Sequence, residues 1–392
     1  MPLTSTARPS RTRLTVLVAT ALVALAACGD DDATADTSSD TAAQTDPIST
    51  TPETAETEPA DTAAPPETEP PVETDAPTVT ECPVETEAPA DTEPADDAAA
   101  FPVTIEHGLG ETLIESPPER VVALGTPEAD ALFALGVAPV GAPSNPTAPD
   151  GLYVWWDGAI DPSATTLLVS DFSGAFNLEQ VAALEPDLIL AATSAVDESA
   201  YGLYEEIAPT VPFLTAPFQD SWQEVTTMVG AAVGMPDEAD AVIASTSASI
   251  DRLRTDAPGL DGATYTFNVV PAPGAVISVT EPADVANRFF AELGLGIAPS
   301  VADLPRQPGT GAMISPEQLA LIAADVVMMF YASEDAAAAI RDSPVFAATA
   351  AASDGRVIEL TGDQAVAVRV PSVLAVPWLL DSIGPQLVAA VG

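Results

Sequence analysis

The pattern of apolar and polar positions becomes periodic from Phe101 onward. The apolar run over 120–124 predicts a buried strand, and the spacing of apolar residues over 128–135 predicts the helix that follows it. A short apolar stretch over 137–140 predicts the next strand. Because strands and helices alternate in this way several times, the sequence predicts an α/β fold with parallel sheets.

A hairpin precedes the first of these units. Alternating residues over 101–105 and 111–114 predict two strands around the turn sequence HGLG, which begins at His107. A single histidine in such a place is interpreted as a turn or surface residue and not as a ligand.

One helix–strand unit occurs twice. Residues 179–190 read EQVAALEPDLIL and residues 317–328 read EQLALIAADVVM, and the two align without a gap. Each copy predicts a helix with a glutamate in its first turn, then an aspartate eight positions later, then an apolar strand. The repeat predicts two related α/β lobes. The alternative is that one unit recurs by chance within a single sheet.

A long helical stretch separates the two copies. Apolar spacing predicts one helix over 221–233 and a second, uninterrupted helix over 237–254. We therefore expect an N-terminal lobe over 101–235, a bridging helix over 236–257 and a C-terminal lobe over 258–392. A rigid helical bridge would limit the closure of the lobes.

The first 28 residues have the features of an export signal. Three arginines precede an apolar run over 14–27, which is shorter than the roughly 20 residues that span a membrane. The sequence LAAC, ending at Cys28, resembles a bacterial lipobox, which implies cleavage before Cys28 and acylation of its thiol. This places the chain at the outer face of the cytoplasmic membrane, held by lipid. The alternative is an ordinary signal peptide with an incidental cysteine.

Residues 29–100 are predicted to be a disordered tether. They contain 21 acidic residues, no basic residue and no aromatic residue, so they cannot form a core. Charge repulsion and proline favour an extended spacer that carries a globular domain away from the membrane. The alternative is a disordered leader without that role. Cys82 within it is interpreted as a free or incidental thiol.

The charge of the chain excludes several classes of function. The chain has 59 acidic residues against 11 basic ones, for a net charge of −48, and every basic residue is arginine. Nucleic acid is therefore excluded as a partner. One histidine and two cysteines cannot build a multi-histidine or multi-cysteine metal site. A secreted hydrolase is disfavoured because no Gly-x-Ser-x-Gly sequence is present. We predict no enzyme, no catalytic residue, no cofactor and no metal bound by the protein itself.

Several segments taken together resemble one family. They are RVVALG at 120–125, DALFALGVAPVG at 130–141, LEPDLIL at 184–190, IAPTV at 207–211 and ISPEQL at 314–319. The chain resembles the substrate-binding proteins of ABC transporters for ferric siderophores, whose relatives bind vitamin B12 or haem. The resemblance implies two Rossmann-like lobes of the periplasmic-binding-protein type, joined by one long helix, with the ligand in the cleft between them.

The resemblance also implies the partners. The ligand is a small-molecule iron complex in which the siderophore itself holds the iron, and a monomeric receptor delivers it to a permease dimer with its ATPase subunits. Glu179 and Glu317 occupy the positions where an acidic residue on each lobe meets permease arginines in this family. The alternative is that each glutamate stabilises only its own helix.

The ligand is expected to contact aromatic and arginine side chains. An aromatic loop and a strand end supply most of the candidates, for which the alternatives are core packing or neutralisation of surface charge. Few arginines are available, which disfavours a trianionic catecholate complex and leaves hydroxamates open. The candidates are Tyr153, Trp155, Trp156, Trp222, Arg306, Phe330, Tyr331 and Arg369.

Other functions remain open at this point. A corrinoid or haem receptor belongs to the same transporter class, although a haem receptor would use a tyrosine as its axial ligand here. A sensory or adhesive surface lipoprotein could keep the fold without transport.

Overall fold

The computed structural model describes residues 101–161, 163–171, 174–194, 196–307 and 311–392. The predictions for the export signal, Cys28, the tether and Cys82 lie outside these residues. Among the helices that are described, none is both long and apolar enough to cross a membrane.

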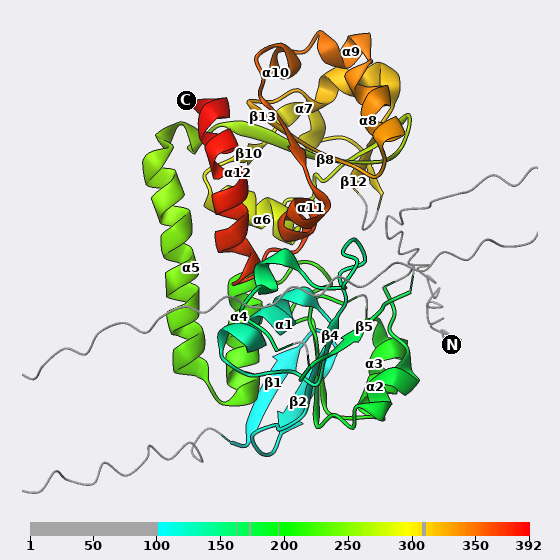
Figure 1. Cartoon of the computed structure of the whole chain (residues 1–392), viewed down its shortest axis with the longest axis vertical. Coiled ribbons are helices and arrows are strands. Elements are labelled where there is room, and N and C mark those ends of the chain that lie inside the picture. The colour runs from blue at the N-terminus through cyan, green and yellow to red at the C-terminus, as the bar shows by residue number, and fades with distance from the viewer. Residues whose placement is uncertain (1–100, 162, 172–173, 195, 308–310) are drawn as a thin grey trace, which may run out of the picture. The chain divides into compact units, whose positions relative to one another are not determined.

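Two sheets organise the described part of the chain (Figure 1). The first has five parallel strands in the order β5-β4-β3-β6-β7. An antiparallel hairpin precedes it, with His107 paired to Gly110 across a turn of two residues. The strands are β1 (Val103–His107), β2 (Gly110–Ile114), β3 (Val121–Ala123), β4 (Gly141–Pro143), β5 (Thr166–Leu168), β6 (Leu188–Ala191) and β7 (Thr210–Pro212).

Helices cover both faces of this first sheet, which explains why its central strands β3 and β6 are apolar and buried at every position. In β3, Val122 faces the core beneath α2 and α3, whereas Val121 faces the core beneath α1 and α4. The sheet and its helices form the N-terminal lobe. The helices are α1 (Thr126–Ala134), the 3₁₀ turn η2 (Val154–Trp156), α2 (Leu178–Ala183), α3 (Glu198–Glu205) and α4 (Trp222–Val233).

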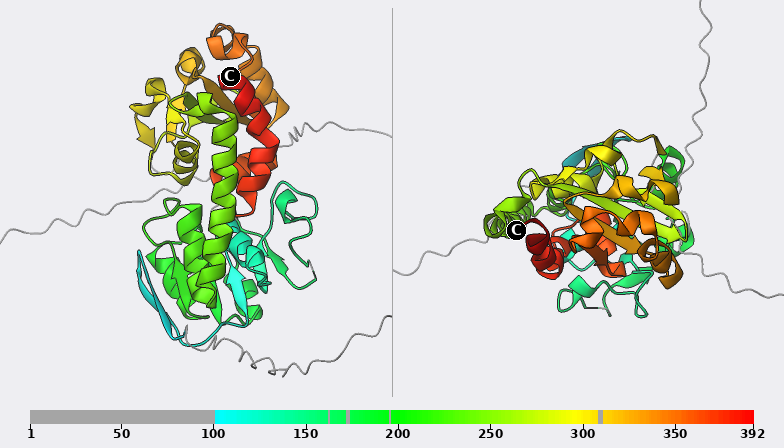
Figure 2. Two further views of the ribbon diagram at one scale, coloured as in Figure 1. Left: turned by 90° about the vertical axis from the view of Figure 1, so that its left-hand side faces the viewer. Right: turned by 90° about the horizontal axis from the view of Figure 1, so that it is seen from above.

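Helix α5 leads from the first sheet to the second. It spans Pro236–Asp256, within one or two residues of the range predicted. Before it, α4 begins at a capping box of Ser221 and Glu224 and ends at Gly234, whose positive φ ends the helix. Figures 1 and 2 show α5 alongside the C-terminal helix α12, and the Thr246 hydroxyl of α5 donates a hydrogen bond to the carbonyl of Val373, just before α12.

The second sheet has seven strands in the order β11-β12-β9-β8-β13-β14, with β10 also paired to β8. Strands β8, β13 and β14 are parallel, whereas β9 and β12 run antiparallel to their neighbours. The strands are β8 (Thr264–Ala272), β9 (Ala275–Ser278), β10 (Gly296–Ile297), β11 (Arg306–Gln307), β12 (Gly311–Ile314), β13 (Val326–Tyr331) and β14 (Val357–Leu360).

Helices also cover this second sheet on both faces, which completes the C-terminal lobe. One core contains Phe289 of α6 and Leu379 of α12, and the other contains Ile340 of α8 and Phe346 of α9. The helices are η3 (Pro258–Leu260), α6 (Val285–Glu292), α7 (Pro299–Ala302), η4 (Pro316–Ile322), α8 (Glu334–Arg341), α9 (Pro344–Ala347), α10 (Ala350–Ser353), α11 (Gly362–Arg369) and α12 (Ala375–Val391).

The predicted fold of two α/β lobes is confirmed, but two of its elements are wrong. Residues 137–140 are not a strand. The left-handed Gly136 turns the chain, and the Val137 N–H bonds back to the carbonyl of Leu132, so pairing along the sheet starts only at Val140. The second copy of the repeat begins with the 3₁₀ element η4 and not with an α-helix.

The repeated aspartate makes equivalent hydrogen bonds in the two lobes. Asp187, before β6, accepts hydrogen bonds from the N–H groups of Glu119 and Arg120, at the start of the neighbouring strand β3. Asp325, before β13, accepts from the N–H and hydroxyl of Thr264, at the start of the neighbouring strand β8. Both copies of the repeat therefore tie a strand to its parallel neighbour.

Candidate functional site

The loops that follow the parallel strands bring the two lobes together. Asn145 lies just after β4 and Asp363 just after β14, and the Asn145 amide donates a 2.8 Å hydrogen bond to the Asp363 carboxylate. Ligands of open α/β sheets bind at such carboxyl edges, where the strand order reverses. The boundary between these edges is therefore the candidate ligand site.

The strand order of the first sheet reverses between β3 and β6, and a buried carboxylate occupies that point. Glu128, in the first turn of α1, is 0% exposed and accepts hydrogen bonds from the N–H and the hydroxyl of Thr193, at 2.9 and 2.6 Å. Burial raises the pKa of Glu128. Gly125 is required beside it, because a Cβ there would lie 2.2 Å from the Glu128 carboxylate.

A second buried carboxylate links the two lobes. Asp130 accepts hydrogen bonds from both indole N–H groups of η2, those of Trp155, at 2.9 Å, and Trp156. It also accepts one from the hydroxyl of Ser372, which precedes α12 in the C-terminal lobe. Burial raises the pKa of Asp130 to about 7. The aromatic loop, defined here as residues 153–156, is therefore attached to the opposite lobe through this side chain.

The rings of the aromatic loop pack into the core. Tyr153, Trp155 and Trp156 are 5%, 7% and 1% exposed. The Trp155 ring also lies 5.4 Å from the ring of Trp378 on α12, measured between centroids. Their contact with a ligand stays a prediction, and in this conformation they join the lobes.

Trp222 lies at the start of α4 and also bridges the lobes. It is 3% exposed, and its indole N–H donates a 3.2 Å hydrogen bond to Glu292 at the end of α6. The preceding loop contains Phe218, which has a left-handed backbone (φ 59°) and whose carbonyl accepts a hydrogen bond from the Val285 N–H.

Both arginines predicted as ligand contacts are engaged by carboxylates. Arg369, at the end of α11, lies 2.9 Å from Asp284, and its guanidinium lies 5.0 Å from the centroid of the Phe218 ring in the other lobe. Arg306, in β11, lies 2.5 Å from Glu281. Of the two, Arg369 is the one that contacts both lobes.

Phe330 and Tyr331 end β13 and are half-buried. A pocket of about 390 Å³ lies there, and it is lined by Tyr331, Ser333, Arg341, Glu359 and Thr361, among others. The Arg341 guanidinium lies 5.6 Å from the centroid of the Tyr331 ring. Burial raises the pKa of Tyr331 to about 12, so its hydroxyl is neutral, and no described residue forms a hydrogen bond with it.

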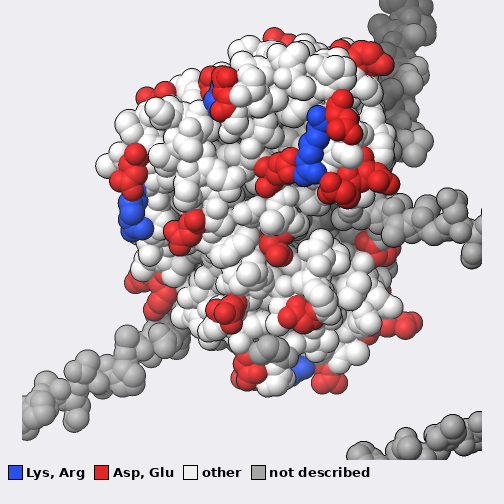
Figure 3. Space-filling model, turned by 45° about the horizontal axis from the view of Figure 1, so that its top comes forward, with Lys and Arg blue, Asp and Glu red and all other residues white. Residues whose placement is uncertain are grey.

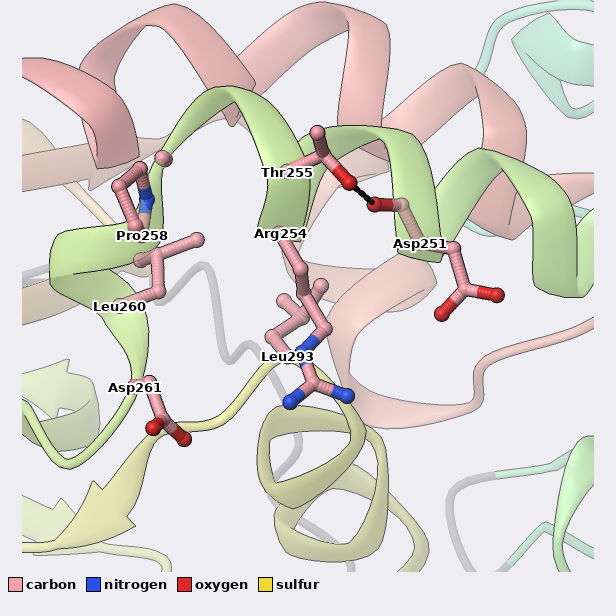
Figure 4. Close-up of a pocket in the computed structure, with 8 residues that line it drawn as sticks. Asp251, Arg254, Thr255, Pro258, Leu260, Asp261 and Leu293 are labelled. Atoms are coloured by element: carbon pink, nitrogen blue, oxygen red, sulfur yellow. Dashed lines mark hydrogen bonds between the residues drawn. The ribbon is translucent and has the colours of Figure 1, made fainter.

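A second pocket, of about 400 Å³, lies at the end of α5 (Figure 4). Arg254 extends beside Leu293, and the Thr255 hydroxyl is bonded to the carbonyl of Asp251. It shares no residue with the predicted ligand contacts.

His107 flanks the hairpin turn, one of the two places predicted for it, but it is not at the surface. It is 8% exposed, and burial lowers its pKa. The Leu109 N–H donates to its Nδ1, so Nε2 carries the proton and donates a 2.9 Å hydrogen bond to the Thr112 hydroxyl. This histidine therefore stabilises the hairpin through its hydrogen bonds, a role that sequence spacing did not indicate.

Glu179 and Glu317 are exposed, one on each lobe. Glu179 lies in the first turn of α2, which Asn177 caps, and Glu317 lies in the first turn of η4, which Ser315 caps. A hydrogen bond from its own backbone N–H lowers the pKa of Glu317.

Several of the bridging residues have no signal in the sequence that could have identified them. Asp130 and Ser372 are 242 positions apart, and Asn145 and Asp363 are 218 apart. No cluster of three metal-ligating side chains occurs within the residues described.

The fold and the lobe boundary define a class of two-lobed α/β binding protein. Residues 121–364 match the family model described as periplasmic binding protein, and the chain belongs to this family.

The curated relatives fit this membership. The chain is 30% identical over 210 residues to the ferric enterobactin-binding periplasmic protein FepB of Escherichia coli O6:H1. The aligned region covers 52% of this chain and 61% of that relative. It is also 30% identical over 152 residues to the probable siderophore-binding lipoprotein YfiY of Bacillus subtilis, covering 38% and 44% of the two chains. The chain thus spans about three fifths of the first relative and less than half of the second.

Solved structures agree on the fold. A periplasmic solute binding protein from Mycobacterium smegmatis superposes with a TM-score of 0.63 at 28% identity, covering 74% of this chain and 99% of that one. PiaA of Streptococcus pneumoniae TIGR4, in complex with ferrichrome, superposes with a TM-score of 0.64 at 23% identity, covering 74% and 98%.

Proposed function

We propose that this protein is an extracytoplasmic receptor that binds a ferric siderophore and delivers it to an ABC-type importer. The observation that carries this proposal is the match of 121–364 to the periplasmic binding protein family, together with relatives whose names contain ferric enterobactin and siderophore. Such a receptor binds and releases its ligand unchanged, so it needs neither catalytic residues nor a cofactor.

The ligand is proposed to lie between the carboxyl edges of the two sheets. The hydrogen bond between Asn145 and Asp363 brings these edges together, and the pocket at Tyr331 opens at the end of β13. Its volume falls in the range of roughly 300–1,000 Å³ that small-molecule sites occupy. In this arrangement the siderophore holds the iron, and the protein contacts only the chelate.

The partner and the anchor follow from the same proposal. The protein acts as a monomer and docks on a permease dimer with ATPase subunits through Glu179 and Glu317. It is held at the outer face of the cytoplasmic membrane by acylation of Cys28. The exposure of both glutamates supports the docking role.

Tryptophan fluorescence provides the test, because all four tryptophans lie in the described part and are buried or half-buried. The full chain is titrated with ferrichrome, ferric enterobactin, ferric citrate, haem and cobalamin. Saturable quenching by a ferric chelate below micromolar concentration is expected. Saturation by haem or cobalamin alone would assign a different receptor of the same class, and no saturable response would favour a sensory or adhesive role.

A conservative variant tests the place of the site. Tyr331→Phe removes a hydroxyl that has no partner among the described residues, so any loss of affinity reports a contact with the ligand. We expect about a fivefold loss, since one hydrogen bond contributes about 1 kcal/mol. Tyr204→Phe, at a buried tyrosine of α3 outside the site, is the matched control. Equal affinity of both variants would remove Tyr331 from the site.

A further inference from the structure

The charge of the lobes restricts the ligand that they can bind. Residues 101–392 contain 38 acidic side chains against 8 arginines, a net charge of −30. On the face drawn in Figure 3, basic side chains lie against acidic ones. An anionic ligand therefore depends on arginines that are free to turn toward it.

Three arginines of the C-terminal lobe, two of which contact the other lobe, are already paired. Arg306 and Arg369 each form an ion pair with one carboxylate, so each pair is neutral. Arg288 donates to the carbonyl of Gln219 in the other lobe and lies 2.9 Å from Glu224.

The remaining arginines do not supply a free positive charge at the predicted ligand site. Arg341 lies between two carboxylates, Glu334 and Glu359, so this group carries one net negative charge within the pocket at Tyr331. Within the described residues, only Arg252 and Arg254 have neither an ion pair nor a hydrogen bond through the guanidinium, and both are on α5.

The same pocket offers neutral donors. Tyr331, Ser333 and Thr361 line it, and the Tyr331 hydroxyl is buried beside it without a hydrogen-bond partner among the described residues. The Ser333 and Thr361 oxygens accept hydrogen bonds from helix N–H groups, which leaves their protons free to donate. Neutral hydroxyls suit the oxygens of an uncharged chelate, whereas an arginine drawn toward a polyanion would leave its carboxylate unpaired beside that polyanion.

We infer that the ligand is a ferric chelate with little or no net charge, of the tris-hydroxamate class, and not a tris-catecholate. Three hydroxamates each contribute one negative charge and neutralise Fe³⁺, whereas three catecholates contribute six and leave a trianion. This inference rests on the proposed receptor function and names the chemical class of its ligand.

Two probes of opposite class provide the test. Ferrichrome, a neutral tris-hydroxamate, and ferric enterobactin, a trianionic tris-catecholate, are titrated into the full chain at pH 7.4, in low and in high salt. We expect ferrichrome to bind at least 100-fold more tightly. Any affinity for ferric enterobactin should rise with salt as repulsion is screened, while that for ferrichrome stays constant.

Variants test the role of the paired carboxylates. Glu281→Gln and Asp284→Asn release Arg306 and Arg369, and each should shift the ratio of the two affinities about tenfold toward the catecholate. Asp354→Asn, at a carboxylate paired with Arg356, is the matched control and should leave the ratio unchanged.

The outcomes separate the two proposals. Equal or tighter binding of ferric enterobactin by the unaltered chain would overturn the inference and leave the receptor function standing. Failure of every ferric chelate to bind would overturn the receptor function, and the inference with it. The salt series needs no variant, so it decides the question even where a substitution impairs folding.

Discussion

Two opposing effects act on the pKa of Asp130. Its three hydrogen-bond donors favour the ionised carboxylate, whereas complete burial and the nearby Glu128 disfavour it. Burial prevails, since the pKa rises to about 7, well above the roughly 3.9 of an aspartate in an unfolded chain. The charge of this side chain therefore changes near neutral pH.

This shift predicts a pH dependence of stability. The pKa of Asp130 is raised in the folded state. Its contribution to the free energy of unfolding is therefore fully present below about pH 4 and is lost as pH rises through about 7. Asp130→Asn cannot ionise, so it should flatten the loss of unfolding free energy between about pH 4 and 7. It should also cost about 1–3 kcal/mol at pH 5, because the amide cannot accept from all three donors. Urea denaturation at several pH values measures both effects.

Two further variants separate charge from the link between lobes. Asp157→Asn changes an exposed aspartate in the same loop and should leave the pH profile of the unaltered protein intact. Ser372→Ala removes the bond between the lobes and also the acceptor of the Ala375 N–H at the start of α12, and it should cost about 1–2 kcal/mol. A pH profile of Asp130→Asn parallel to that of the unaltered protein would show that Asp130 does not titrate in this range.

At the scale of elements, the aspartate of the repeated unit connects two parallel strands by hydrogen bonds. Asp187 bonds the two residues just before β3, and Asp325 bonds the first residue of β8. The hydrogen bonds from Thr264 lower the pKa of Asp325. The contribution of Asp325 to the free energy of unfolding is therefore present above about pH 4, the pKa of an unfolded aspartate. It is lost as pH falls through the lower pKa of the folded state.

We expect Asp187→Ala and Asp325→Ala each to lower the free energy of unfolding by about 0.5–1.5 kcal/mol at pH 7, since both side chains are exposed. The cost of Asp325→Ala should shrink as pH falls below 4. Asp303→Ala, at an exposed aspartate after α7, is the control. Equal stability of all three variants would mean that the repeated aspartate has no structural role.

The elements that the sequence predicted best are those with local signals. The capping box at Ser221 and the end of α4 at Gly234 depend only on nearby residues. The prediction of a strand at 137–140 was wrong because the left-handed Gly136 delays the pairing with β3. Apolar spacing does not indicate such a turn. The aromatic loop was predicted to lie in the cleft, yet its burial depends on Ser372 and Trp378, which are more than 200 residues away.

At the scale of the whole folded part, one apolar core extends through both lobes. It joins Val121 of the first sheet to Met328 of the second, and it includes the aromatic loop and α12. This continuity, with the polar bridges at Asp130 and Asn145, opposes wide separation of the lobes. A permease would therefore meet the two lobes as a surface of nearly fixed geometry.

A fixed surface makes paired docking charges effective, because both lobes can engage a two-fold partner at once. We expect the double variant Glu179→Arg and Glu317→Arg to reduce uptake of the iron complex at least tenfold while its affinity stays unchanged. The reason is that, in the proposed docking, each reversed charge would face a permease arginine. Radioactive iron uptake by cells and fluorescence titration of the same protein measure the two quantities.

The control is a double variant with the same change in net charge, Glu198→Arg and Glu238→Arg. Both of these glutamates are also exposed and lie in the first turns of α3 and α5. Because the two double variants alter the overall charge equally, only a position-specific role gives different uptake. If both variants import iron as the unaltered protein does, Glu179 and Glu317 act only on their own helices.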